Sequence, residues 1–156
     1  MNFYNREKAV DYAKKWAKSR NPAYYNFDKS GGDSTNFVSQ SIFAGCGKMN
    51  YKANFGWYYT DINVRSNSWT GAGFFYKFIV NNASSGPYGY ETNIENIEIG
   101  DIIQISYGSG FSQSFLVVKK SDDLYLCSHS FDCNEKALKS IDFCNMRCIH
   151  IEDVRI

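Results

Sequence analysis

The side chain best placed for nucleophilic chemistry in this sequence is a hydroxyl, that of Ser34. It lies in residues 31–40, Gly-Gly-Asp-Ser-Thr-Asn-Phe-Val-Ser-Gln, where two glycines allow a sharp turn before a helix. Asp33, Ser34 or Thr35 can each cap that helix. A thiol at the first helical turn would ionise readily, because free backbone N–H groups and the helix dipole favour an anion. A hydroxyl there stays neutral, so the segment has the position of a nucleophile without its reactivity.

The same residues resemble the nucleophile segment of the bacterial putative amidase domains, a branch of the papain-like cell-wall amidases and endopeptidases. The family carries cysteine at the position of Ser34, and the rest of the segment agrees. The resemblance extends over nearly the whole chain, through Tyr4-Asn5-Arg6, Gly56-Trp57-Tyr58-Tyr59, Ser68-Trp69-Thr70 and Gly100-Asp101. It implies a papain-like fold, action on peptide or amide bonds, and peptidoglycan as the substrate class.

The resemblance also implies a histidine base and a third group that orients it. In the family the histidine begins the strand after the Gly-Asp pair, and Gln113 stands at that position here. The next strand of the family carries the orienting group, which His129 matches. The ancestral catalytic positions are therefore Ser34, Gln113 and His129, with the first two substituted.

These substitutions predict a non-catalytic relative. Gln113 cannot act as a base, because an amide does not exchange protons near neutral pH. Loss of one member of a catalytic unit costs on the order of 10⁴ to 10⁶ in rate. We therefore expect a module that binds a peptide or cell-wall fragment, or another protein. Two alternatives stay open: an active amidohydrolase that uses Ser34, with His129 as its base, and an interaction or inhibitor protein that does not use the ancestral cleft.

Other polar and aromatic side chains are expected to complete the pocket. The residues predicted to support or line it are Asp33, Asn36, Gln40, Trp57 and Trp69. Aromatic residues make up 17% of the chain, and an excess of Tyr and Trp suits a groove for peptide or sugar. The same rings serve equally well as core or lid residues, which need no ligand.

The last third of the chain gathers cysteines and histidines, namely Cys127, His129, Cys133, Cys144, Cys148 and His150. Their Cys-x-His and Cys-x₃-Cys spacings can bind zinc, but no Cys-x₂-Cys pair is present. A disulfide within 133–148 and buried free thiols are the alternatives. We expect no metal and no cofactor.

Composition narrows the class of partner. The 156 residues carry a net charge of +1 with acids and bases interspersed, so we expect no nucleic-acid partner. No run approaches the roughly 18 apolar residues of a membrane span. Residues 1–20 are charged and periodic, unlike a signal peptide, whereas the resemblance implies an extracellular or cell-wall location; the location stays open. The length predicts one domain, 1–156.

Hydrophobic periodicity predicts helices before strands. Helices are expected over 6–19, from Ser34 to a stop at Gly45, and over 71–80, with a long connection over 46–70. Strands are expected at 102–105, 115–118, 124–126 and 149–154, with a hairpin turn at 121–123. This order predicts an α+β fold with N-terminal helices packed on a C-terminal antiparallel sheet, the papain-like layout that the resemblance implies.

Overall fold

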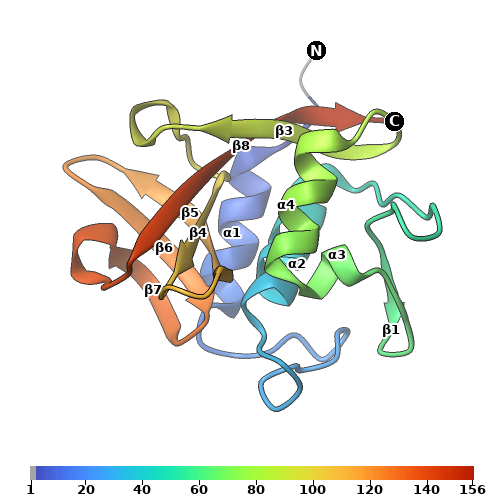
Figure 1. Ribbon diagram of the computed structural model, residues 1–156, viewed down its shortest axis with the longest axis horizontal. Coiled ribbons are helices and arrows are strands. Elements are labelled where there is room, and N and C mark those ends of the chain that lie inside the picture. Colours follow the sequence, from blue (N-terminus) through green and yellow to red (C-terminus); the bar gives the residue numbers. More distant parts are fainter. Residues whose placement is uncertain (1–2) are drawn as a thin grey trace.

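A six-stranded antiparallel sheet is the central element of the computed structural model, which describes residues 3–156 (Figure 1). Its strand order is β3-β8-β4-β5-β6-β7. The strands are β3 (Gly86–Thr92), β4 (Ile102–Ser106), β5 (Phe111–Lys120), β6 (Leu124–His129), β7 (Asp132–Ala137) and β8 (Asn145–Arg155). A separate two-stranded sheet consists of β1 (Tyr59–Asp61) and β2 (Val64–Arg65). The predicted α+β class with antiparallel pairing is confirmed.

Helices cover one face of the large sheet. They are α1 (Arg6–Trp16), α2 (Ser34–Cys46), α3 (Asn67–Thr70) and α4 (Ala72–Asn81), and two 3₁₀ turns are η1 (Ile94–Asn96) and η2 (Leu138–Ser140). Helices α1, α2 and α4 each contact β5 and lie together beside the sheet in Figure 1. None of the helices in the described residues has the length and apolar character needed to cross a membrane.

Two hydrophobic cores lie on opposite faces of the sheet. The core under the helices includes Val38, Ile42, Phe75, Ile102 and Leu116. The core on the far face includes Ile103, Ile105, Phe115, Val117 and Leu138. Neighbouring residues such as Ile102 and Ile103 contribute to different cores because successive side chains of a strand point to opposite faces.

Helix α2 continues past the predicted stop at Gly45. It ends at Cys46, and Gly47 caps it in the left-handed conformation at φ 63°. A Cβ atom on Gly45 would lie 2.6 Å from the carbonyl oxygen of Asn5. Gly45 thus allows the helix to approach the beginning of the chain closely, and the prediction that it ends the helix was wrong.

The remaining predicted elements agree with the structure in part. The helices expected over 6–19 and 71–80 correspond to α1 and α4, and the four expected strands to β4, β5, β6 and β8. The segment 46–70, expected to be a long connection, also contains β1, β2 and α3. Strands β3 and β7 had not been predicted. Both are edge strands of the sheet, and β7 is mostly polar with half of its residues exposed, so it lacks the alternating apolar pattern of a buried strand.

Candidate functional site

Ser34 is the first residue of α2 and lies against strand β5. Its Oγ accepts a hydrogen bond from the backbone N–H of Ser114 at 3.1 Å. The hydroxyl of Thr35 lies 2.9 Å from the hydroxyl of Ser114. Asp33 occupies the N-cap position, although its side chain makes no capping hydrogen bond. The first turn of α2 is therefore joined directly to the sheet.

Gln113 points away from that contact. It pairs with Ile105 on β4, whose side chain lies in the far-face core, and cross-strand partners share a face of the sheet. The Gln113 side chain is partly exposed and makes no hydrogen bond with any described residue. The structure therefore does not bring Gln113 beside Ser34. The residue found there is Ser114, which the sequence reasoning did not select.

His129 is held at both ring nitrogens. Its Nδ1 lies 2.5 Å from Oδ2 of Asp33, and its Nε2 lies 2.7 Å from the carbonyl oxygen of Trp16. The ring stacks on Phe37 with centroids 4.1 Å apart, and the side chain is only 2% exposed. Both ring nitrogens are therefore engaged by oxygen atoms of the protein. Neither nitrogen is left to take a proton from Ser34.

The other carboxylate oxygen of Asp33 ties the turn before α2 to the helix. Oδ1 accepts the backbone N–H of Phe27 at 2.8 Å and the side-chain amide of Asn36 at 2.9 Å. The Nε of Arg20 lies 3.5 Å from Oδ2. Asp33 therefore holds the preceding loop, the helix and, through His129, strand β6 in one arrangement.

The predicted aromatic residues support α2 from inside the protein. Trp69 Nε1 donates to Oδ1 of Asn36 at 3.0 Å, and Trp57 Nε1 donates to the hydroxyl of Ser39 at 3.1 Å. Both indole side chains are fully buried. They are packed in the core under the helices, where they hold the helix.

Gln40, the last of the predicted supporting residues, is also buried within α2. Its side-chain oxygen accepts the hydroxyl of Tyr12, on α1, at 2.5 Å. The contact joins the two helices that lie on either side of His129.

A chain of polar side chains leads from Ser114 to the protein surface. Gln104 donates from Nε2 to the hydroxyl of Ser114 at 3.1 Å and accepts from Nε of Arg147 at 2.9 Å. The guanidinium of Arg147 lies over the rings of Tyr76 and Phe111, at 3.8 and 4.2 Å from their centroids. Burial lowers the pKa of Arg147. These residues come from β4, β5, β8 and α4, so no local sequence signal links them.

The putative amidase domain family matches residues 3–151. The chain belongs to this family. Uncharacterized protein YhbB of Bacillus subtilis strain 168 is 35% identical over 122 residues, which cover 75% of this chain and 38% of that protein. The chain thus spans well under half the length of this relative. No solved structure matches the chain.

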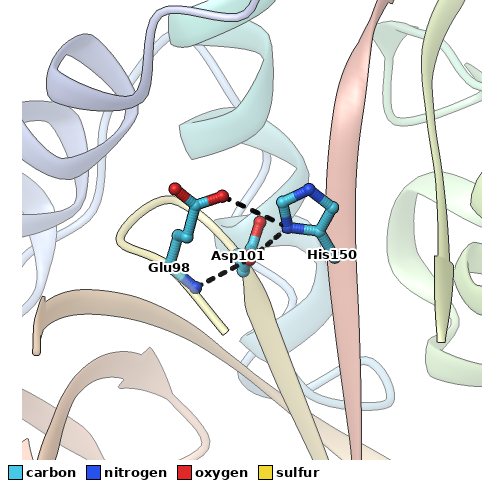
Figure 2. A group of neighbouring side chains, drawn as sticks. All are labelled: Glu98, Asp101 and His150. Carbon is cyan, nitrogen blue, oxygen red and sulfur yellow. Dashed lines mark hydrogen bonds and ion pairs between the residues drawn. The ribbon is translucent and has the colours of Figure 1, made fainter. Parts of the chain in front are cut away.

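The cysteines and histidines of residues 127–150, whose spacing can bind zinc, do not come together in one site. All five cysteines are free thiols. Burial raises the pKa of Cys127 and of Cys148 to about 11, which keeps both thiols protonated near neutral pH. Among the described residues, the group with the spacing of metal ligands is Glu98, Asp101 and His150, whose ligand atoms lie within 4.8 Å of one another (Figure 2).

Hydrogen bonds already occupy the buried carboxylate of that group. Oδ1 of Asp101 accepts from Arg6 at 2.7 Å and from the backbone N–H of Ile151 at 2.9 Å. Oδ2 accepts from the backbone N–H of Glu98 at 2.9 Å and lies 2.8 Å from Nδ1 of His150. The hydrogen bond to Asp101 raises the pKa of His150. The cluster therefore anchors the start of the chain to β4 and β8.

Proposed function

We propose that this amidase-family domain has lost amide hydrolysis and binds a peptide or cell-wall fragment on a papain-like scaffold. The observation that carries the proposal is the environment of Ser34, which the resemblance aligns with the nucleophile. Its Oγ contacts the backbone N–H of Ser114, and neither histidine of the chain hydrogen-bonds to it.

A hydroxyl in that environment is a poor nucleophile. Serine needs a base to remove its proton, and a helix dipole alone does not ionise a hydroxyl. His129 is engaged by Asp33 and by the Trp16 carbonyl, and Gln113 and Ser114 carry no group that takes up a proton near neutral pH. We expect turnover at least about 10⁴-fold below that of an intact catalytic unit.

The retained support of the helix tip favours binding over simple decay of the site. Asp33 and Asn36 fix the first turn of α2 through buried hydrogen bonds, and Tyr25 lies exposed beside it, with its carbonyl accepting from Asn36 at 3.0 Å. A buried, fully hydrogen-bonded network keeps a surface in one geometry, which lowers the entropic cost of binding. An exposed tyrosine next to such a surface offers stacking area and a polar end to a peptide.

Activity is tested with soluble muropeptides as substrate. We expect no release of peptide or amine by the unaltered chain above the level of a Ser34→Ala variant. The double variant Ser34→Cys with Gln113→His, and the double variant Ser34→Cys with Ser114→His, test which strand position would serve a base. Turnover by the unaltered chain that Ser34→Ala abolishes would overturn the proposal in favour of an active amidohydrolase.

Binding is tested by calorimetry with the same muropeptides. We expect Tyr25→Ala to weaken binding about 5- to 10-fold, because exposed aromatic contacts carry much of the energy of peptide recognition. Tyr90→Ala is the matched control, since Tyr90 is an exposed tyrosine on β3. No measurable binding by the unaltered chain would reject the binding role and favour an interaction protein that recognises other partners.

A further inference from the structure

A cleft between residues 52–58 and helix α4 collects positive charge. Its volume is about 780 Å³, within the range of roughly 300–1,000 Å³ that holds small ligands. Lys52, Arg65 and Lys77 line it, and none of the described residues that line it is Asp or Glu. It includes neither Ser34 nor His129, so it is distinct from the candidate site at the start of α2.

The arginine of this cleft lacks a hydrogen-bond acceptor. Every other arginine of the chain donates a side-chain hydrogen bond within the described residues, whereas Arg65 donates none and its buried Nε has no partner. Its guanidinium lies over the ring of Phe27, 4.8 Å from the centroid. A buried donor without an acceptor is rare in folded proteins and is unfavourable. Such a donor at a cleft points to an acceptor supplied by a ligand.

The two lysines are equally unpaired. Neither Lys52 nor Lys77 forms a side-chain ion pair or hydrogen bond with any described residue. Three cations that face one cleft without a counter-charge repel one another, and an anionic ligand relieves that repulsion.

Exposed aromatic rings flank these cations. Phe55 is 80% exposed, and Phe74 is 56% exposed on the same turn of α4 that carries Lys77. Residues three apart on a helix lie on one face, so Phe74 and Lys77 are presented together. Large exposed rings beside a cleft are typical of binding surfaces.

We propose that this cleft binds acidic peptides, with carboxylates on Lys52, Arg65 and Lys77 and an apolar side chain between Phe55 and Phe74. Asparagine and serine side chains line the same cleft and match the amides of a peptide backbone. A peptide is favoured over a nucleic acid because the chain has a net charge of only +1 and only three of its cations line this cleft. The proposal does not depend on what occurs at Ser34.

The test uses two blocked tripeptides, acetyl-Glu-Phe-Glu-amide and its Gln-Phe-Gln counterpart, in calorimetric titrations of the full chain. We expect the Glu peptide to bind at least about tenfold more tightly, with an affinity that falls as salt increases. Arg65→Gln and Lys77→Gln should each weaken binding of the Glu peptide about tenfold. Lys77 is exposed, so that variant keeps the test valid where a change at Arg65 disturbs folding.

Lys119→Gln is the matched control, because Lys119 is an exposed lysine on β5 outside the cleft. Binding of the Glu peptide should be unchanged in this variant and in Ser34→Ala. The second control distinguishes binding in the cleft from binding at the start of α2. Equal binding of the two peptides, or unchanged binding in both cleft variants, would overturn the proposal. Displacement of the Glu peptide by an equal concentration of inorganic phosphate would also overturn it, since the cleft would then select only a simple anion.

Discussion

The two histidines of this domain are each held by a buried aspartate, and the two pairs differ in what faces the second ring nitrogen. His129 pairs with Asp33 at the start of α2, and its Nε2 meets the carbonyl oxygen of Trp16. His150 pairs with Asp101 between β4 and β8, and its Nε2 lies 3.6 Å from Glu152, a half-exposed carboxylate. We call His129 and Asp33 the closed pair, because a backbone carbonyl meets the second nitrogen, and His150 and Asp101 the open pair, because the second nitrogen faces the surface.

This difference separates a supporting histidine from a catalytic one. In a catalytic dyad the carboxylate holds one nitrogen and the other faces the reacting group. His129 keeps the carboxylate but directs its second nitrogen at a carbonyl, which only accepts hydrogen bonds. The second nitrogen of His150 faces the half-exposed Glu152, and the thiol of Cys148, two residues earlier on β8, belongs to the far-face core and stays protonated. In both pairs a carboxylate holds one ring nitrogen, and the pairs differ in what the second nitrogen meets.

Removal of the carboxylate at the open pair should have the largest effect. Asp101→Ala removes the buried counter-charge of Arg6 and His150, leaving them the more distant carboxylate of Glu98 at 3.7 Å. It also takes away the side-chain acceptor of the Ile151 N–H. We expect the free energy of unfolding to fall by about 3–5 kcal/mol, measured by urea denaturation. Glu98→Ala removes a half-exposed carboxylate of the same cluster and should cost less than about 1 kcal/mol. Similar losses in the two variants would show that Asp101 is not the anchor.

The closed pair is tested by replacing its ring without removing the stacking. His129→Phe keeps an aromatic ring over Phe37 but removes the hydrogen-bond partner of Asp33 Oδ2. It also leaves the Trp16 carbonyl with only the N–H of Ser19, at 3.3 Å. The loss of these two hydrogen bonds, one of them to a carboxylate, should lower the free energy of unfolding by about 2–4 kcal/mol. Hydrogen exchange at the first turn of α2 should quicken in parallel. A variant as stable as the unaltered chain would show that the ring is not a structural support and would reopen a role for it beside Ser34.

Helix α2 begins beside the His129 and Asp33 pair, and its C-terminal end packs against the beginning of the chain at Gly45. The packing of this C-terminal end can be tested separately. A Cβ atom on Gly45 would lie 2.6 Å from the Asn5 carbonyl oxygen and 2.9 Å from the ring of Tyr4, whose hydroxyl donates to the carbonyl of Gly100 at 2.6 Å. Gly45→Ala should therefore cost about 1–3 kcal/mol in thermal or urea unfolding, despite the higher helix propensity of alanine. Gly73→Ala, in α4 with open space around it, should be neutral or stabilising by up to about 1 kcal/mol. A larger loss of stability in Gly73→Ala than in Gly45→Ala would contradict this packing.

Local motifs were enough to predict the family and the position of Ser34. Residues 31–40 carry a turn, a helix start and an apolar stripe within ten positions, and the structure begins α2 at Ser34. The α+β class followed in the same way, because helical periodicity occurs before the strands in the chain. Such signals depend only on neighbours in sequence.

The partners of these residues could not be predicted because they depend on register and long-range packing. Gln113 and Ser114 are adjacent, and a shift of one residue decides which of them faces α2. Trp69 is buried among side chains far away in the sequence, and its hydrogen-bond partner Asn36 lies 33 positions earlier. The carbonyl of Trp16 that closes the His129 pair is a backbone group, which carries no signal in the side-chain pattern.

The smallest expected effect is the pH dependence of the open pair. The hydrogen bond to Asp101 raises the pKa of His150 above its usual 6.5, while the nearby guanidinium of Arg6 acts in the opposite direction and Glu98 adds to the rise. A raised pKa in the folded state means that the protonated ring stabilises the fold fully below about pH 6.5, and that this contribution is lost as the pH rises through the folded-state pKa. The unfolding free energies of the unaltered chain and of His150→Gln should therefore differ more at pH 5.5 than at pH 8.5, by less than about 1 kcal/mol because the ring is partly solvated. Carboxylates common to both chains cancel in this difference, so a gap that widens towards pH 8.5 would mean that the ring is bound in its neutral form, and the two pairs would then differ in charge as well as in exposure.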